Sequence, residues 1–213
     1  MFKKYVSIVF VLAGVASAQA GEIYAGVGFP GISLGYAQSV APNLGLRGEY
    51  TGGLSMSKSG LRNGVNFNGN LKAQSVSALV DYFPMNSSFR LTGGVNFNDT
   101  KFTLNSTGGS AMIDNKPVNL VGQFFNVEIK QPGVTPYLGI GYGFKPDSKT
   151  GFGFYADAGV MVGKFTSATS TSLVTSGQNI TQANVDAQTA SIRDSVSKLS
   201  VLPKVSVGVS YRF

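Results

Sequence analysis

Apolar and polar side chains alternate along most of this sequence with a period of two. In residues 204–213 the odd positions carry valine or an aromatic ring, and the even positions carry Lys, Ser, Gly or Arg. Successive side chains of a β-strand point to opposite faces, so this pattern predicts a strand with one apolar and one polar face. The pattern recurs in seven further segments, namely 23–29, 32–37, 44–56, 75–83, 89–98, 137–144 and 152–163.

The connections between these eight segments differ in length. Short turns of favourable composition are expected at 40–43, 85–88 and 145–149, and the tight connection Phe29-Pro30-Gly31 joins the first two segments. Long connections rich in Ser, Thr, Asn and Gly are expected near 58–71, 105–120 and 167–200. Short turns at one end and long loops at the other are typical of a transmembrane barrel. We therefore predict an all-β fold, an eight-stranded antiparallel up-and-down transmembrane β-barrel.

The first twenty residues have the features of a secretory signal peptide. Lys3 and Lys4 form a positive segment, residues 5–16 are apolar, and Ala18-Gln19-Ala20 is a small-x-small cleavage site. The alternative, an N-terminal membrane anchor, needs about 20 apolar residues, and this stretch is shorter. We expect 1–20 to be cleaved after export through the inner membrane and 21–213 to form one outer-membrane β-barrel domain.

Composition separates the barrel from a secreted β-sandwich, whose strands would also alternate. Charged residues make up 13% of the chain, against about 25% in an ordinary soluble domain. The polar face of a sandwich is its charged solvent surface, whereas the polar positions here are mostly Gly, Ser, Thr and Asn. The net charge of +7 comes from Lys and Arg scattered singly, so no nucleic-acid partner is expected.

The chain contains no Cys, His or Trp. Disulfides, zinc sites with Cys or His ligands and mechanisms with an imidazole base are therefore excluded. No Ser stands out as the partner of a Lys or carboxylate base. We accordingly expect neither an enzyme nor a cofactor or metal site.

The signal peptide, the alternation over 21–213 and the terminal sequence VSVGVSYRF resemble Gram-negative outer-membrane β-barrel proteins, in particular the small eight-stranded group of OmpA, OmpX and OmpW. In that family the last strand typically ends in an aromatic residue that the barrel-assembly machinery reads. The resemblance implies that Tyr211 and Phe213 belong to an assembly signal, and that the chain is a cell-surface protein among outer-membrane lipid and lipopolysaccharide. Enzymatic members of the family use a His, which this chain lacks.

If the apolar faces meet lipid, eight charged side chains point into the barrel. They are four acids and four bases: Glu22, Arg47, Glu49, Asp81, Arg90, Asp157, Lys204 and Arg212. An eight-stranded barrel is just wide enough for side chains to fill it, so we expect these charges to pair with each other. A salt-bridged plug is expected near the periplasmic end, where five of them lie: Arg47, Glu49, Asp81, Arg90 and Arg212. The alternative is a porin-like narrow gated path with the same charges as its constriction.

These features predict a monomeric outer-membrane barrel with a structural or surface-interaction role and a largely closed interior. The first alternative is a narrow channel of the OmpW kind for small or apolar solutes. A soluble secreted β-sandwich that binds a ligand is the third hypothesis.

Residues 181–198 depart from the period of two and are predicted to form an amphipathic helix in the last long loop. Its apolar stripe is Val185, Ile192, Val196 and Leu199, and Thr181 or Asn184 can cap it. The stripe is expected to fold over the barrel mouth or against neighbouring loops, or alternatively to dock a host or surface ligand or lipopolysaccharide. Residues 117–131 could extend a strand beyond the membrane or add a hairpin, which leaves ten strands as the alternative to eight.

Overall fold

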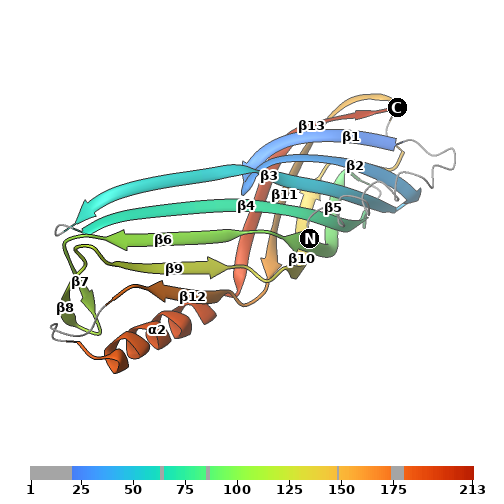
Figure 1. The fold of residues 1–213 in the computed structure, drawn as a ribbon. Helices are drawn as coiled ribbons and strands as arrows, with labels where there is room; N and C mark the ends of the chain where they lie inside the picture. Colours follow the sequence, from blue (N-terminus) through green and yellow to red (C-terminus); the bar gives the residue numbers. More distant parts are fainter. Residues whose placement is uncertain (1–20, 63–64, 85–86, 148, 174–179) are drawn as a thin grey trace.

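The structure, a computed structural model, describes residues 21–62, 65–84, 87–147, 149–173 and 180–213. The predicted signal peptide, residues 1–20, lies outside these ranges. Within them the chain forms thirteen strands and one helix (Figure 1). The predicted all-β class with a helix in the last long connection is confirmed, but the strand count is higher than either eight or ten.

Eight strands pair in a closed order. The order around the set is β1, β2, β3, β4, β5, β10, β11 and β13, each strand pairs with the next, and β13 pairs with β1. All of these pairs are antiparallel, and we call this set the ring. Its members are β1 (Gly21–Phe29), β2 (Gly31–Ala41), β3 (Leu44–Arg62), β4 (Val65–Tyr82), β5 (Phe89–Asn98), β10 (Val134–Tyr142), β11 (Gly151–Val162) and β13 (Val201–Arg212).

The remaining strands lie beyond one end of the ring. Strands β3 and β4 continue past it, and β6 (Lys101–Thr107), β9 (Phe124–Lys130) and β12 (Thr166–Thr171) pair in that order beside β4. We call residues 54–62, 65–73, β6, β9 and β12 the extension. A separate hairpin of β7 (Ser110–Ile113) and β8 (Lys116–Asn119) and the helix α2 (Gln182–Ser197) lie against it (Figure 1).

The extension is the main correction to the sequence prediction, because 58–71, 105–120 and 167–200 are expected to be long connections without strands. In β4 the odd positions from Val65 to Ala73 face the inside of the curved sheet, and the positions between them are Asn or Lys. Asparagine is depleted in strands and frequent in turns, so an Asn-rich polar face conceals the alternation. For residues 117–131 both alternatives occur, since β8 forms a hairpin with β7 and β9 extends the sheet beside β6.

A β-bulge separates the ring part of β3 from its extension part. Gly52 and Gly53 together oppose Gln74 of β4, and Gly53 has φ of 81°, which glycine adopts without steric cost. The extra residue shifts the inward positions of β3 from odd to even numbers. The inner face of the extension is therefore continuous with the inner face of the ring.

The largest apolar core lies in the extension rather than in the ring. It contains Val65 of β4, Phe125 and Val127 of β9, Ile113 of β7 and Val185 of α2. Among the described residues, no helix is both long enough and apolar enough to cross a membrane.

Candidate functional site

The candidate site is the interior of the ring, where all eight charged residues expected on the inner face are buried. Their exposed fractions run from 0% for Arg90 to 5% for Glu22 and Asp157. They come from six strands, because β1, β3, β4, β5, β11 and β13 each contribute one or two of them. Burial of so many charges requires close pairing, since an unpaired charge in a low-dielectric interior is very costly.

Four of these residues form a central cluster across the lumen. Arg47 lies 2.5 Å from Asp81 (Nε–Oδ2) and 3.1 Å from Asp157 (Nη1–Oδ2). Arg90 completes the cluster, 3.3 Å from Asp81 (Nε–Oδ1) and 2.6 Å from Asp157 (Nη2–Oδ1). Each arginine thus contacts both aspartates, and the four groups join β3, β4, β5 and β11.

Glu49 links this cluster to the opposite wall of the ring. It forms an ion pair with Lys204 of β13, and its Oε2 lies 3.9 Å from Arg47 Nη1. Tyr24 Oη donates to Glu49 Oε2 at 3.0 Å, and Thr51 Oγ1 donates to Glu49 Oε1 at 3.1 Å. The connected set therefore holds three bases and three acids and is balanced in charge.

The pair Glu22 and Arg212 lies apart from that network, beside the turn between β10 and β11. Arg212 Nη2 is 3.0 Å from Glu22 Oε2, and the guanidinium also donates to the carbonyls of Lys145 and Pro146, both at 2.7 Å. In the same exposed turn, a hydrogen bond from Lys145 lowers the pKa of the Asp147 carboxyl. Arg212 thus fastens this turn to the last strand.

Three aromatic rings pack against the central cluster. The ring centroids of Tyr24, Phe144 and Tyr155 lie 4.8 to 5.2 Å apart. The guanidinium carbons of Arg47 and Arg90 lie 5.1 and 4.6 Å from the Phe144 centroid, within the range of a cation–π contact. The rings exclude water on one side of the cluster, which strengthens its ion pairs.

Phe144 is the interior residue that the sequence pattern misplaces. The alternation puts it on the lipid face, but β10 ends at Tyr142 and Phe144 is buried, with φ of 58°. This left-handed backbone conformation directs the Phe144 side chain into the interior of the strand ring, where packing holds it. The Gly143 and Pro146 turn signals around it were the available sequence clue.

Further along the lumen, side chains also occupy the interior. Ser77 and Asn96 are hydrogen-bonded to each other, and Leu79, Tyr137 and Met161 pack together, all five nearly fully buried. Beside the central cluster, the hollow bounded by Arg47, Asp81 and Phe144 measures about 10 Å³. That is about the smallest space that holds one water molecule.

Only part of the predicted apolar stripe of the helix is buried in the structure. Val185 and Val196 are buried and Ile192 is partly buried against the core of the extension. Leu199 does not belong to the stripe, because α2 ends at Ser197 and Leu199 is 54% exposed. At the start of α2, the Thr181 backbone N–H donates to Asn184 Oδ1 at 2.9 Å. The helix therefore covers the extension and not the ring interior.

Tyr211 and Phe213 lie at the end of the last strand with exposed fractions of 38% and 57%. The Phe213 backbone N–H donates to the Gly21 carbonyl at 3.1 Å, which joins the two ends of the described chain. Both aromatic side chains are thus on the outside of the ring, near the short turns.

The same all-β architecture occurs in solved structures. Acinetobacter baumannii CarO2 superimposes with a TM-score of 0.62 at 19% identity, over 93% of this chain and 100% of that chain. Acinetobacter baumannii CarO gives 0.57 at 21% identity, over 92% and 98%. A major outer membrane protein from Thermus thermophilus gives 0.49 at 19% identity, over 92% and 100%. No protein-family model and no curated protein matches the sequence. The likeness to CarO2 and CarO establishes a shared fold.

Proposed function

We propose that the chain is an outer-membrane β-barrel protein, in which the ring is an eight-stranded barrel that crosses the membrane. On strand β13, the side chains that point out of the ring are apolar from Val201 to Tyr211. Five of them are 38% to 54% exposed: Val201, Val205, Val207, Val209 and Tyr211. Ten steps of about 3.3 Å make about 33 Å along the strand. Because barrel strands tilt by about 40° from the barrel axis, this corresponds to about 25 Å along the axis. This matches the apolar band of about 25 Å in outer-membrane barrels.

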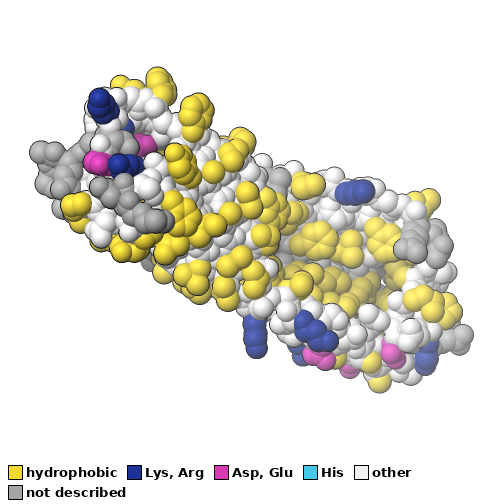
Figure 2. Space-filling view, turned by 180° about the vertical axis from the view of Figure 1, so that it is seen from behind, with side chains coloured by type: hydrophobic (Ala, Val, Ile, Leu, Met, Phe, Trp, Pro, Cys, Tyr) yellow, Lys and Arg dark blue, Asp and Glu magenta, His cyan; other side chains and the backbone are white. Residues whose placement is uncertain are grey.

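An aromatic belt supports this orientation. Exposed aromatic side chains lie at the ends of five neighbouring ring strands near the short turns: Tyr82, Phe89, Tyr142, Phe152 and Tyr211. Aromatic rings favour the membrane–water interface, and the charges in Figure 2 lie on either side of the apolar wall, at one end of the molecule and spread over its other half. The short turns then face the periplasm and the extension lies outside the cell. Tyr211 and Phe213, in this belt and just after it, are suited to act as the assembly signal.

The interior of this barrel is closed. The role of the barrel is to hold the extension at the cell surface, and the protein acts as a monomer. The observation that carries this proposal is the cluster of Arg47, Arg90, Asp81 and Asp157, which spans the lumen with ion pairs of 2.5 to 3.3 Å. A solute could pass only if these pairs separated, and each buried charge left unpaired costs several kcal/mol. The narrow channel for small or apolar solutes is therefore the second candidate.

Two measurements test the proposal. After cell fractionation the protein should be recovered with the outer membrane, and recovery in the soluble periplasm would favour the secreted sandwich and overturn the location. Refolded protein in a planar bilayer should give no conductance steps. Reproducible steps that change in size in Asp157→Asn would show a conducting path through the cluster and overturn the closed interior.

A further inference from the structure

The inner face of the extension contains an apolar groove that is open to solvent. Met56 of β3, Leu71 of β4 and Phe102 of β6 lie in one row across paired strands, and Phe67 and Leu104 line the groove beside them. Met56 is 59% exposed and Phe102 36% exposed, so no element within the described ranges covers this row. Figure 2 shows the hollow and the apolar side chains inside it.

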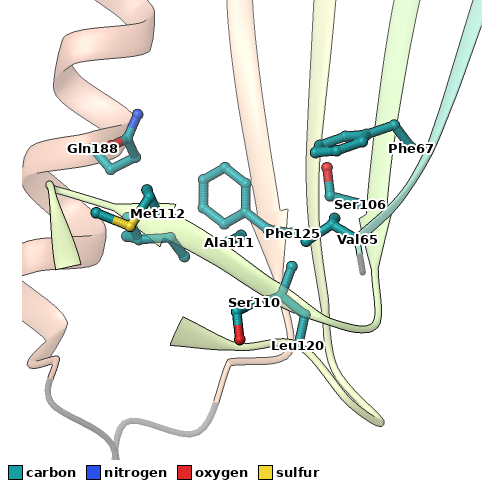
Figure 3. Close-up of a pocket in the computed structure, with 10 residues that line it drawn as sticks. Val65, Phe67, Ser106, Ser110, Ala111, Met112, Leu120, Phe125 and Gln188 are labelled. Carbon is teal, nitrogen blue, oxygen red and sulfur yellow. The ribbon is translucent and has the colours of Figure 1, made fainter. Parts of the chain in front are cut away.

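The groove is large enough for a small molecule and shares the Phe67 side chain with a second hollow. Its volume is about 600 Å³, within the roughly 300–1,000 Å³ of small-molecule sites. Phe67 also lines an adjoining pocket of about 210 Å³, formed with Val65, Phe125 and residues of the β7–β8 hairpin (Figure 3). An extended apolar chain could therefore lie along the sheet with its end beneath the hairpin.

Two glycines keep the floor of the groove open. Gly60 and Gly69 are both lining residues, and neither has a positive φ that would require glycine. A Cβ atom at Gly60 would meet nothing within 4 Å, and one at Gly69 would come no closer than 3.6 Å to its neighbours, with Phe102 the nearest. Side chains would fit at these positions, so the missing side chains create volume rather than relieve strain.

The charge of the groove favours an anion. Lys58 lies on the same face, between the Met56 and Gly60 positions, and the ten lining residues include no acid. Among the described residues, no ion pair involves Lys58. An apolar trough with one unpaired cation complements a molecule with an apolar tail and a single negative group.

We propose that this groove binds a single-chain amphiphile, a long-chain fatty carboxylate, with its tail along Phe67, Leu71 and Phe102 and its carboxylate at Lys58. The proposal rests on the proposed function in one respect, since a cell-surface extension would meet such molecules from outside the cell. It names the ligand class of that surface and does not depend on whether the barrel conducts.

The test measures binding of dansyl-labelled undecanoate to the full chain in lipid nanodiscs, with empty nanodiscs as the baseline for partition into lipid. Wild-type protein should show saturable binding above that baseline. Gly69→Leu, which fills the floor, should weaken it at least tenfold. Leu61→Ser is the control, because Leu61 lies on the neighbouring strand β3, on the opposite face of the sheet from Gly69, and is 71% exposed. This control should bind as wild type does.

A second comparison tests the role of Lys58. Lys58→Gln should weaken competition by dodecanoate about tenfold and leave competition by dodecanol, which has no charge, unchanged. Absence of saturable binding, or equal binding by Gly69→Leu and Leu61→Ser, would overturn the proposal. Concentration-dependent dimers that Gly69→Leu abolishes would assign the groove to a second copy and overturn it as well. Failure of the outer-membrane location would be seen separately, in fractionation.

Discussion

Replacing Arg47 with methionine removes a cation that three buried carboxylates share. Its guanidinium lies 2.5 Å from Asp81, 3.1 Å from Asp157 and 3.9 Å from Glu49, and it is 2% exposed. The variant leaves two bases, Arg90 and Lys204, to neutralise three acids. Methionine fills part of the volume, so the main effect is electrostatic.

The expected cost follows from this burial. Removal of one member of a buried ion pair costs about 3–5 kcal/mol, because the remaining charge stays desolvated. At 1.4 kcal/mol per factor of ten, the folding equilibrium should fall by about two to three and a half powers of ten. The exposed pair Lys130–Glu128 is the control, with an Nζ–Oε1 distance of 2.6 Å but a Lys130 side chain that is 57% exposed. Lys130→Met should cost less than about 1 kcal/mol.

Reversible urea titration in phospholipid vesicles provides the measurement. Circular dichroism and electrophoretic mobility report folding, since the chain has no Trp for fluorescence. The double variant Arg47→Met, Asp81→Asn restores the charge balance and should recover more than about 1 kcal/mol relative to additivity. A cost for Arg47→Met no larger than that of Lys130→Met would refute the argument that these ion pairs are desolvated.

Three further changes have defined outcomes. Gly94→Ala should lower the yield of folded protein severely, because the new Cβ would lie 2.9 Å from the Leu79 Cα, whereas Gly133→Ala, with nothing within 4 Å, should refold normally. Val196→Asp should speed hydrogen exchange in α2, since it places a charge at a buried position of the helix, and an unchanged exchange rate would contradict that burial. Leu199→Asp, at an exposed site, is the control. Phe213→Ala should slow assembly in cells, measured by the heat-modifiable mobility of the folded barrel, while refolding in vitro stays near the wild-type rate; equal assembly rates in cells would exclude an assembly role for this side chain.

The sequence predicts the ring well and the extension poorly, for a physical reason. Alternation is strong where one face is apolar and the other is Gly or Ser, as in β11 and β13, because in the proposed transmembrane barrel lipid and lumen impose opposite demands on the two faces. In the extension the outer face meets water and carries Asn and Lys, as at Asn66 and Lys72. A strand with this composition has the sequence pattern of a loop, so it is predicted as one. The helix bounds are predicted to within one residue, but the end of its stripe at Leu199 is not.

The interior illustrates a different limit. Alternation places Arg47, Asp81 and Asp157 on the inner face, but it carries no information about which of them meet. Those contacts depend on the stagger between strands, which joins residues more than a hundred positions apart, such as Arg47 and Asp157. Phe144 required knowledge of where β10 ends, because one residue in a left-handed conformation reverses the direction of its side chain.

The bulge at Gly52 and Gly53 divides one continuous sheet into two parts that can change independently. Because side chains alternate with a period of two, loss of one residue between the bulge and Met56 would turn Met56 and Lys58 outward and Leu61 inward. Loss of two residues from β3 and two from β4 would shorten the extension and keep every face. We therefore expect relatives of this protein to differ in the height of the extension by even steps, while the ring below the bulge keeps its length.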